Sequence, residues 1–199
     1  MIARRVTLAL ALSQLVSWGV GYYAIGVFGP RIAADLGWSR GEIHAGLSVA
    51  LVVMGLVSPA VGRRIDRDGG RAVMTVGFLV LAAGLALAAR VERPWTWWLV
   101  WAVIGVGLRM TLYDACFAAL VRVDVEAARR AISAVTLAGG LASTVFWALG
   151  NRLAESLGWR SALEIFAATA AAAALLPLAL PGDAASRARG PAPSTADPP

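Results

Sequence analysis

The sequence is poor in the residues from which most catalytic and metal-binding centres are built. It has one cysteine, Cys116, one histidine, His44, and no lysine. A single cysteine excludes an internal disulfide and a cysteine-based metal site. The sequence also lacks a phosphate-binding loop and a nucleophile beside a candidate base. We therefore expect a protein that is not an enzyme and that holds neither a metal nor another cofactor.

Charged residues are scarce as well: they make up 15% of the 199 residues, whereas 59% are hydrophobic. A soluble domain of this length needs far more polar surface to cover its core. The net charge is +6, and every one of the 18 cations is an arginine in a chain whose apolar runs separate short charged clusters. This grouping is typical of membrane topology rather than of a phosphate-binding face, and we expect no nucleic-acid partner.

Six apolar stretches are long enough to cross a bilayer as helices, which takes about 20 residues each. Alternation with a period of two is missing, which argues against membrane-spanning strands. The predicted class is an all-α membrane protein with six transmembrane helices. The expected spans are 6–29, 42–61, 72–89, 95–121, 131–151 and 161–180.

The arginines also orient these helices. Eleven of them flank the amino terminus, the 63–71 and 122–130 connections and the tail, and six flank the connections on the other side. Arginine collects on the cytoplasmic side, so both termini are predicted in the cytoplasm of a bacterial-type cell, with the chain a multi-pass protein of the inner or plasma membrane. Trp95, Trp97 and Trp98 are predicted to form an aromatic belt at the outer interface.

The end of the chain differs in composition from the rest. Residues 181–199 contain five prolines and almost no large apolar side chain. Such a segment cannot bury enough surface to offset its ordering entropy. We predict a six-helix bundle over residues 1–180 and a disordered, proline-rich cytoplasmic tail over 181–199.

The most specific motif lies between the second and third spans, where residues 62–71 read GRRIDRDGGR. Gly62 and Gly69 permit positive φ and close approach of two helices. Asp66 can cap a neighbouring helix amino terminus. The arginines hold the connection on the cytoplasmic face.

This motif resembles the signature cytoplasmic loop of the major facilitator superfamily. The matching residues are Gly62, Asp66, Arg67, Gly69 and Arg71, while Gly70 stands where the family usually has a cation. The resemblance implies the amino-terminal six-helix half of a secondary transporter. The GWSR at residues 37–40 resembles bacterial metabolite and organic-anion porters of this family, and the LGWR at residues 157–160 is similar to it, as an internal repeat would be.

Two other motifs depart from the proton-coupled drug antiporters of the same family. Gly105 and Gly107 survive in the fourth span, but Trp101 occupies the place of the antiporters' arginine. The small residues over 138–143 lack the antiporters' proline. Both departures argue against drug/proton antiport.

A polar and aromatic stripe marks the first span. Gln14, Trp18 and Tyr22 recur at four-residue spacing and therefore share one helix face, which we expect to point away from lipid. First helices of the resembled family line the central cavity, which makes these residues candidate substrate contacts. The alternative is helix packing with an interfacial tyrosine.

Charged residues in the fourth span are the second set of candidates, with Tyr113 beside them. Arg109 is expected roughly 18 Å from the cytoplasmic end, close to the midplane, where a cation costs at least ~2.5 kcal/mol. Asp114 follows five residues later, about 140° around a continuous helix, so we do not expect the two to pair. Arg109 would bind an anionic group of the substrate, and Asp114 would carry a proton or pair with another helix. Each could instead be a structural partner.

The function predicted from these residues is secondary transport of a small solute, with an organic anion favoured by Arg109 and a proton as the family's default coupling ion. Transporters of this family have two six-helix bundles, with the substrate between them. The expected partners are therefore a small-molecule substrate, membrane lipid, and a second copy or a second six-helix half. The alternatives are an inactive truncated fragment and a six-helix membrane scaffold or regulatory subunit.

Overall fold

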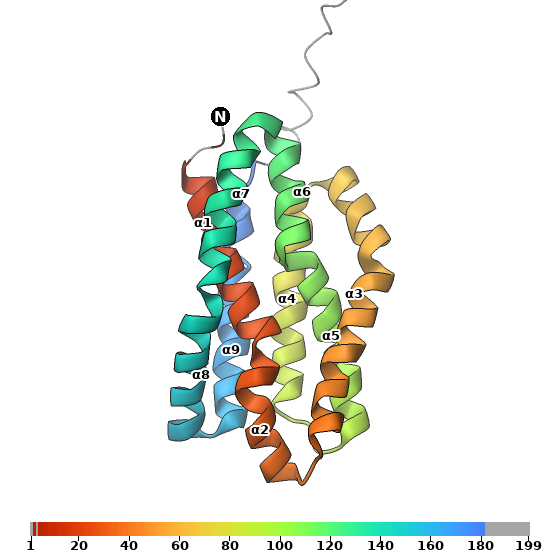
Figure 1. Cartoon of the computed structure of the whole chain (residues 1–199). Helices are drawn as coiled ribbons and strands as arrows, with labels where there is room; N and C mark the ends of the chain where they lie inside the picture. The colour runs from red at the N-terminus through yellow and green to blue at the C-terminus, as the bar shows by residue number, and fades with distance from the viewer. Residues whose placement is uncertain (1, 3, 182–199) are drawn as a thin grey trace, which may run out of the picture.

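The computed structural model describes residue 2 and residues 4–181 (Figure 1). Six helical spans in it are long and apolar enough to cross a membrane, and the described residues contain no strand. The predicted class, an all-α protein with six transmembrane helices, is thereby confirmed. Of the predicted tail over 181–199, all but Pro181 lies outside the described residues.

Three of the six spans are interrupted. The first comprises α1 (Arg4–Val16), a π-helical segment (Ser17–Tyr22) and α2 (Ala24–Leu36); the second is α3 (Arg40–Asp68) and the third α4 (Gly70–Ala88). The fourth comprises α5 (Pro94–Thr111) and α6 (Tyr113–Val123), and the fifth α7 (Val125–Gly140) and α8 (Ala142–Leu157). The sixth is α9 (Trp159–Ala173), followed by a 3-10 turn (Leu176–Ala179).

The spans are not equally enclosed by their neighbours. In Figure 1, α3 stands at one edge of the bundle and α8 at the opposite edge. Only 17% of the most apolar part of α3 is buried, and 22% of that of the fifth span, against 44–56% for the other four spans. The second and fifth spans therefore have the most surface left for lipid or for a partner.

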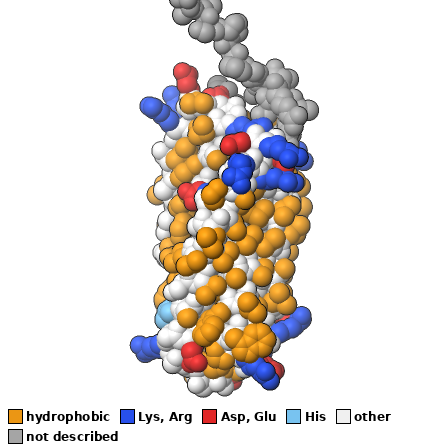
Figure 2. Space-filling view, turned by 90° about the vertical axis from the view of Figure 1, so that its right-hand side faces the viewer, with side chains coloured by type: hydrophobic (Ala, Val, Ile, Leu, Met, Phe, Trp, Pro, Cys, Tyr) orange, Lys and Arg blue, Asp and Glu red, His pale blue; other side chains and the backbone are white. Residues whose placement is uncertain are grey.

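The surface of the α3 side agrees with a bilayer environment. Figure 2 shows a broad apolar band with arginines and carboxylates gathered at both ends. Charged groups flank a hydrocarbon-facing band in multi-pass membrane proteins, because burying an ion in lipid is expensive. The chain is accordingly a multi-pass membrane protein.

The interior contains two apolar cores, one toward each end of the bundle. The first includes Val16 and Leu112 and continues to the end that carries Gly37 and Gly158, here called the outer end. The second includes Leu10 and Ala115 and continues to the opposite end, which carries Ile2 and Leu180. Four buried polar residues of the described part of the chain lie near the boundary of the two cores: Ser13, Gln14, Ser17 and Thr111.

The connection between the second and third spans is tighter than predicted. We expected a loop over 62–71, but α3 continues to Asp68 and α4 begins at Gly70, so Gly69 alone joins them. Gly69 has φ +81°, as predicted, whereas Gly62 lies inside α3 without a positive φ. The error arose because a charged segment was excluded from the span, although a helix can continue beyond the bilayer.

The expectation that Asp66 caps a neighbouring helix was also wrong. Within the described residues, no side chain caps the amino terminus of α4. Asp66 lies in α3 instead, and its backbone carbonyl accepts a hydrogen bond from Arg122. The absence of a cation at Gly70 has a steric reason, since a side chain there would collide with Ala119 on α6.

The tryptophans at the start of α5 do not form the predicted belt. Trp97 is 1% exposed and donates its Nε1–H to the carbonyl of Ile43, at 3.0 Å. Trp98 donates likewise to the carbonyl of Glu42. Of the three, only Trp95 is exposed. Trp97 and Trp98 therefore fasten α5 to α3 rather than facing lipid.

Candidate functional site

The fourth span, Pro94–Val123, is broken at Leu112, between α5 and α6. Leu112 has φ −72° and ψ −177°, and its carbonyl accepts from the N–H groups of Ala115 and Cys116. In the described part of the chain, no N–H of α6 bonds to a carbonyl of α5. The last carbonyls of α5 are therefore left to other donors.

Arg109 and Asp114 form an ion pair across this break. Nη1 of Arg109 lies 3.0 Å from Oδ2 of Asp114, and Nη2 donates to the hydroxyl of Ser58 on α3, at 2.8 Å. The expectation that the two charges do not pair was wrong. It assumed a continuous helix, whereas the extended residue at Leu112 turns α6 and returns Asp114 to Arg109. We call Ser58, Arg109 and Asp114 the ion-pair site.

The two charges of this site are very differently exposed. The side chain of Arg109 is 15% exposed and that of Asp114 is 72% exposed. The guanidinium is thus mostly enclosed, and the carboxylate is the group that the bundle presents. A carboxylate near the midplane is unfavourable against lipid, so this surface is expected to face a wet cavity or another protein surface.

Two polar side chains of the first span satisfy the broken end of α5. Nε2 of Gln14 donates to the carbonyl of Thr111 at 2.7 Å. The hydroxyl of Thr111 donates to the carbonyl of Gly107 at 2.9 Å. The hydroxyl of Ser17 lies 2.6 Å from the hydroxyl of Thr111. Because Thr111 has only one proton to give, Ser17 is the donor of the second bond. Gln14 is fully buried, so the structure does not bring it to a surface where a substrate could contact it.

Aromatic side chains gather beside the ion-pair site, and we call them the aromatic group: Trp18, Tyr22, Tyr23, Tyr113 and Phe117. The ring centroids of Trp18 and Tyr113 are 5.1 Å apart, and those of Tyr113 and Phe117 are 5.2 Å apart and stacked. The hydroxyl of Tyr113 donates to the carbonyl of Thr136 on α7, at 3.1 Å. The rings are partly exposed, and Tyr113 directly precedes Asp114.

Sequence reasoning found only part of this arrangement. The predicted residues Trp18, Tyr22 and Tyr113 do come together, and Arg109 and Asp114 lie beside them. It missed the hydroxyl residues Ser17, Ser58 and Thr111, because small hydroxyl residues are common in apolar helices and nothing in their spacing marks a contact. Whether a solute touches any of these side chains stays a prediction.

The signature residues lie at the end of the bundle opposite the outer end, away from the ion-pair site. Asp68 forms ion pairs with Arg64 and with Arg67, the second at 3.3 Å. These two ion pairs lie within the last turn of α3, and the bond from Arg122 to the carbonyl of Asp66 joins the ends of α3 and α6. The motif therefore has a structural place in this chain, and its role in transport remains a prediction.

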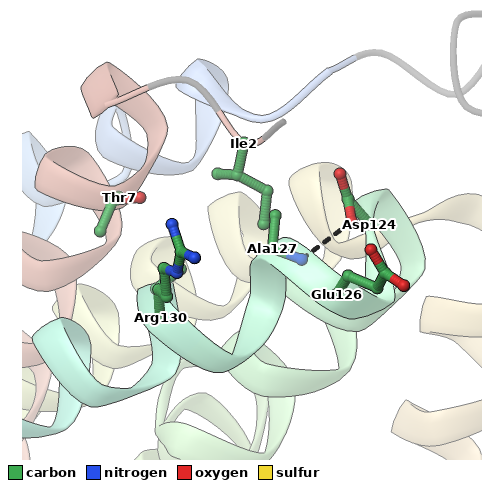
Figure 3. A pocket seen from close by; sticks show the side chains of 7 residues that line it. Ile2, Thr7, Asp124, Glu126, Ala127 and Arg130 are labelled. Carbon is green, nitrogen blue, oxygen red and sulfur yellow. Dashed lines mark hydrogen bonds between the residues drawn. The ribbon is translucent and has the colours of Figure 1, made fainter.

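A recess of about 480 Å³ lies at the same end, between the beginnings of α1 and α7. In Figure 3, Thr7 and Arg130 lie on one side of it and Asp124 and Glu126 on the other. Asp124 caps α7 by accepting from the N–H of Ala127 at 2.9 Å. That hydrogen bond holds the pKa of Asp124 below its usual value. The described residues contain no group of three histidine, cysteine or acidic side chains placed to hold a metal ion.

Comparison with known proteins adds two findings to this geometry. A family model described as Major Facilitator Superfamily matches residues 10–198 of the chain. Proteins named Multidrug resistance protein MdtH from Yersinia enterocolitica, Yersinia pestis and Yersinia pseudotuberculosis are each 34% identical over 91 residues, which is 46% of this chain. The chain covers only 22% of the length of each of these relatives.

Proposed function

The chain belongs to the major facilitator superfamily, and on that premise we propose that it is the amino-terminal six-helix half of a secondary transporter for small organic solutes. It would lie in the bacterial inner membrane with both termini in the cytoplasm. Its ion-pair site and aromatic group would form one wall of the solute pathway. Transporters of this kind hold substrate near the midplane, between two six-helix halves that rock around it.

One observation supports this proposal above the others: Asp114 is 72% exposed although it lies inside a span that is long and apolar enough to cross the membrane. Arg109 offsets its charge on one side only. In a lone bundle the rest of the carboxylate would face hydrocarbon, at a cost of several kcal/mol on the least severe scales (~2.5 or more). A water-filled pathway between two halves removes that cost, because the carboxylate then keeps its hydration.

The second half would be another copy of this chain or a separate six-helix bundle. The two least enclosed spans, α3 and the fifth span, lie at opposite edges of the bundle and have surface free for such a partner. The two halves in this family are parallel repeats. Two copies inserted the same way could therefore pair about an axis along the membrane normal.

The ion pair changes the expectation about substrate charge. An organic anion was favoured because Arg109 was expected to be unpaired. With Asp114 at 3.0 Å, the site has no net charge, and the argument for an anion loses its premise. The name of the Yersinia relatives makes drug-like solutes the first class to test, and the rings of the aromatic group could stack on an aromatic solute.

Coupling to protons would differ from that of the drug antiporters. Their arginine has no counterpart at Trp101, which is buried against Gly46 and Trp97. Asp114 is the carboxylate on the presented surface of this bundle that could bind and release a proton near the midplane. We propose that it does so during transport.

Purified full-length chain in proteoliposomes tests the proposal. Uptake of ethidium, a neutral aromatic solute and benzoate is measured with and without an imposed pH gradient, and cross-linking in the membrane gives the oligomeric state. We expect gradient-dependent uptake of at least one probe by a cross-linked dimer. A dimer that moves none of the three probes, or a chain that stays monomeric, would contradict the self-sufficient half-transporter.

A further inference from the structure

The ion-pair site depends on a distortion of the fourth span, and the distortion has an identifiable cause. Five residues of an unbroken helix would place Asp114 about 140° away from Arg109 around the axis. The extended conformation of Leu112 removes that separation. Leucine has no intrinsic tendency to break a helix, so contacts from elsewhere must stabilise the break.

Those contacts come from the first span. Gln14 donates to the carbonyl of Thr111, which lacks a backbone donor because Ala115 donates to Leu112 instead. Ser17 donates to the hydroxyl of the same threonine. All three side chains are fully buried, so water does not compete for these bonds.

The first span is irregular at the same depth. Its π-helical segment begins at Ser17, directly after the turn that carries Gln14. A π-helical turn shifts the register of the residues around it, and such turns are frequent at functional sites. The buried polar layer formed by Ser13, Gln14, Ser17 and Thr111 lies near the boundary of the two apolar cores.

We propose that Gln14 and Ser17 are positioning residues. By bonding to Thr111 they stabilise the break at Leu112, and the break keeps Asp114 within ion-pair distance of Arg109. Neither touches the solute. The proposal rests on the proposed function, since it explains how the ion-pair site of the pathway is assembled. It replaces the expectation that Gln14 is a substrate contact.

The buried Oε1 of Gln14 also supports a positioning role for this residue. Within the described residues it has no hydrogen-bond partner, although Gln14 is fully enclosed. An unpaired buried acceptor is destabilising, so the favourable contribution of this side chain comes from its amide N–H, which donates to the carbonyl of Thr111. Its neighbour Ser13 offers a contrast, because its hydroxyl bonds only to the carbonyl of Leu10 in its own helix.

Double-mutant cycles on the full-length chain in detergent micelles test the proposal without any transport assay. The midpoint temperature of unfolding is followed by tryptophan fluorescence for Gln14→Leu, Asp114→Asn and the double variant. If Gln14 acts through the break, its loss already frees Asp114 from Arg109. The second substitution should then lower the midpoint by less than half of its effect in the native chain.

Two matched cycles show whether the coupling is specific. Ser13→Ala removes a buried hydroxyl from the same layer without a bond to α5, and its effect should add to that of Asp114→Asn. Asp35 lies at the outer end and shares no partner with Gln14, so the effect of Asp35→Asn should add to that of Gln14→Leu. Ser17→Ala removes one bond of the break and supplies a milder cycle with Asp114→Asn if Gln14→Leu does not fold.

The outcomes are distinct. Coupling of Gln14 or Ser17 to Asp114, with additivity in both controls, supports the positioning role. Additivity of Gln14→Leu and Ser17→Ala with Asp114→Asn would overturn it, because both residues would then stabilise the bundle generally. A failure of transport alone leaves these cycles unaffected, so the two proposals can fail separately.

Discussion

The middle of the bundle and its outer end join the first span to its neighbours by different means. At the outer end, Asp35 accepts from the Nε1–H of Trp159 at 3.0 Å and pairs with Arg160 at 3.4 Å, where water competes for both. In the middle, a few bonds around Thr111 are buried completely. Exposed ion pairs contribute about 0–1 kcal/mol, whereas a buried group that loses its partner costs about 1–3 kcal/mol.

The comparison teaches that the density of polar contacts is a poor guide to their importance in this protein. The outer end has more charged groups, yet each can be replaced by water. The middle has few polar groups, and those that bond to Thr111 lie at the break in the fourth span. Substitutions in the two regions should therefore differ in size and in kind.

The largest effect is expected for Arg109→Ala. It leaves Asp114 near the midplane without its cation and removes the bond to Ser58. Uptake of any transported probe by proteoliposomes should fall to the rate of protein-free vesicles, while membrane insertion stays intact. Arg90→Ala is the control, because Arg90 forms only an exposed pair with Glu164, at 3.7 Å. Unchanged uptake by Arg109→Ala would remove this residue from the pathway.

Next in size is Thr111→Val, which keeps the shape of the side chain and removes its hydroxyl. Ser17 then loses its buried acceptor, and we expect the free energy of unfolding to fall by about 1–3 kcal/mol. A guanidinium titration in micelles measures it. Thr169→Val is the matched control, since Thr169 bonds only to Ile165 one turn earlier in its helix. Equal decreases in the free energy of unfolding of the two variants would show that the buried polar layer is no more important for stability than the rest of the bundle.

A smaller effect is expected for Asp35→Asn at the outer end. The amide oxygen can still accept from Trp159, and only the exposed attraction to Arg160 is lost. The free energy of unfolding should change by less than about 1 kcal/mol, and the change should shrink further at high salt. A loss as large as that of Thr111→Val would show that the outer end is not the weaker region.

The smallest effect is a pH dependence at Asp124, which caps α7. The Ala127 N–H lowers the pKa of this carboxyl in the folded chain, so its contribution to stability is present above the unfolded value of about 3.9 and is lost as the pH falls through the folded value. The substitution Asp124→Asn keeps an oxygen that can cap the helix but removes the group that titrates. Between pH 7 and pH 3 the midpoint temperature of unfolding should therefore fall slightly more for the native chain than for the variant. The same fall in both proteins would show that the titration of Asp124 does not contribute to stability.

The six spans could be predicted because composition alone decides whether a segment enters a bilayer. The ion-pair site could not, because sequence spacing becomes geometry only if the helix is continuous. Leu112 gives no warning of a break, and neither glycine nor proline marks it. The bonds that hold the break come from residues almost a hundred positions earlier in the chain, Gln14 and Ser17.

The buried tryptophans show a second reason for failure. Trp97 was placed at the lipid interface because tryptophan is enriched there. In the structure Gly46 on α3 leaves the space that Trp97 and Trp101 occupy, since a side chain at that glycine would collide with both rings. The complementary glycine lies on a different span, and a single sequence does not tell which helix it will face.

The single glycine between α3 and α4 has a mechanical consequence. Consecutive Cα atoms are about 3.8 Å apart, so Asp68 and Gly70 can never separate by more than roughly twice that distance. A displacement of one helix at this end must therefore move the adjoining end of the other helix as well. A movement of the end of α3 would therefore be passed on to the beginning of α4 through Gly69.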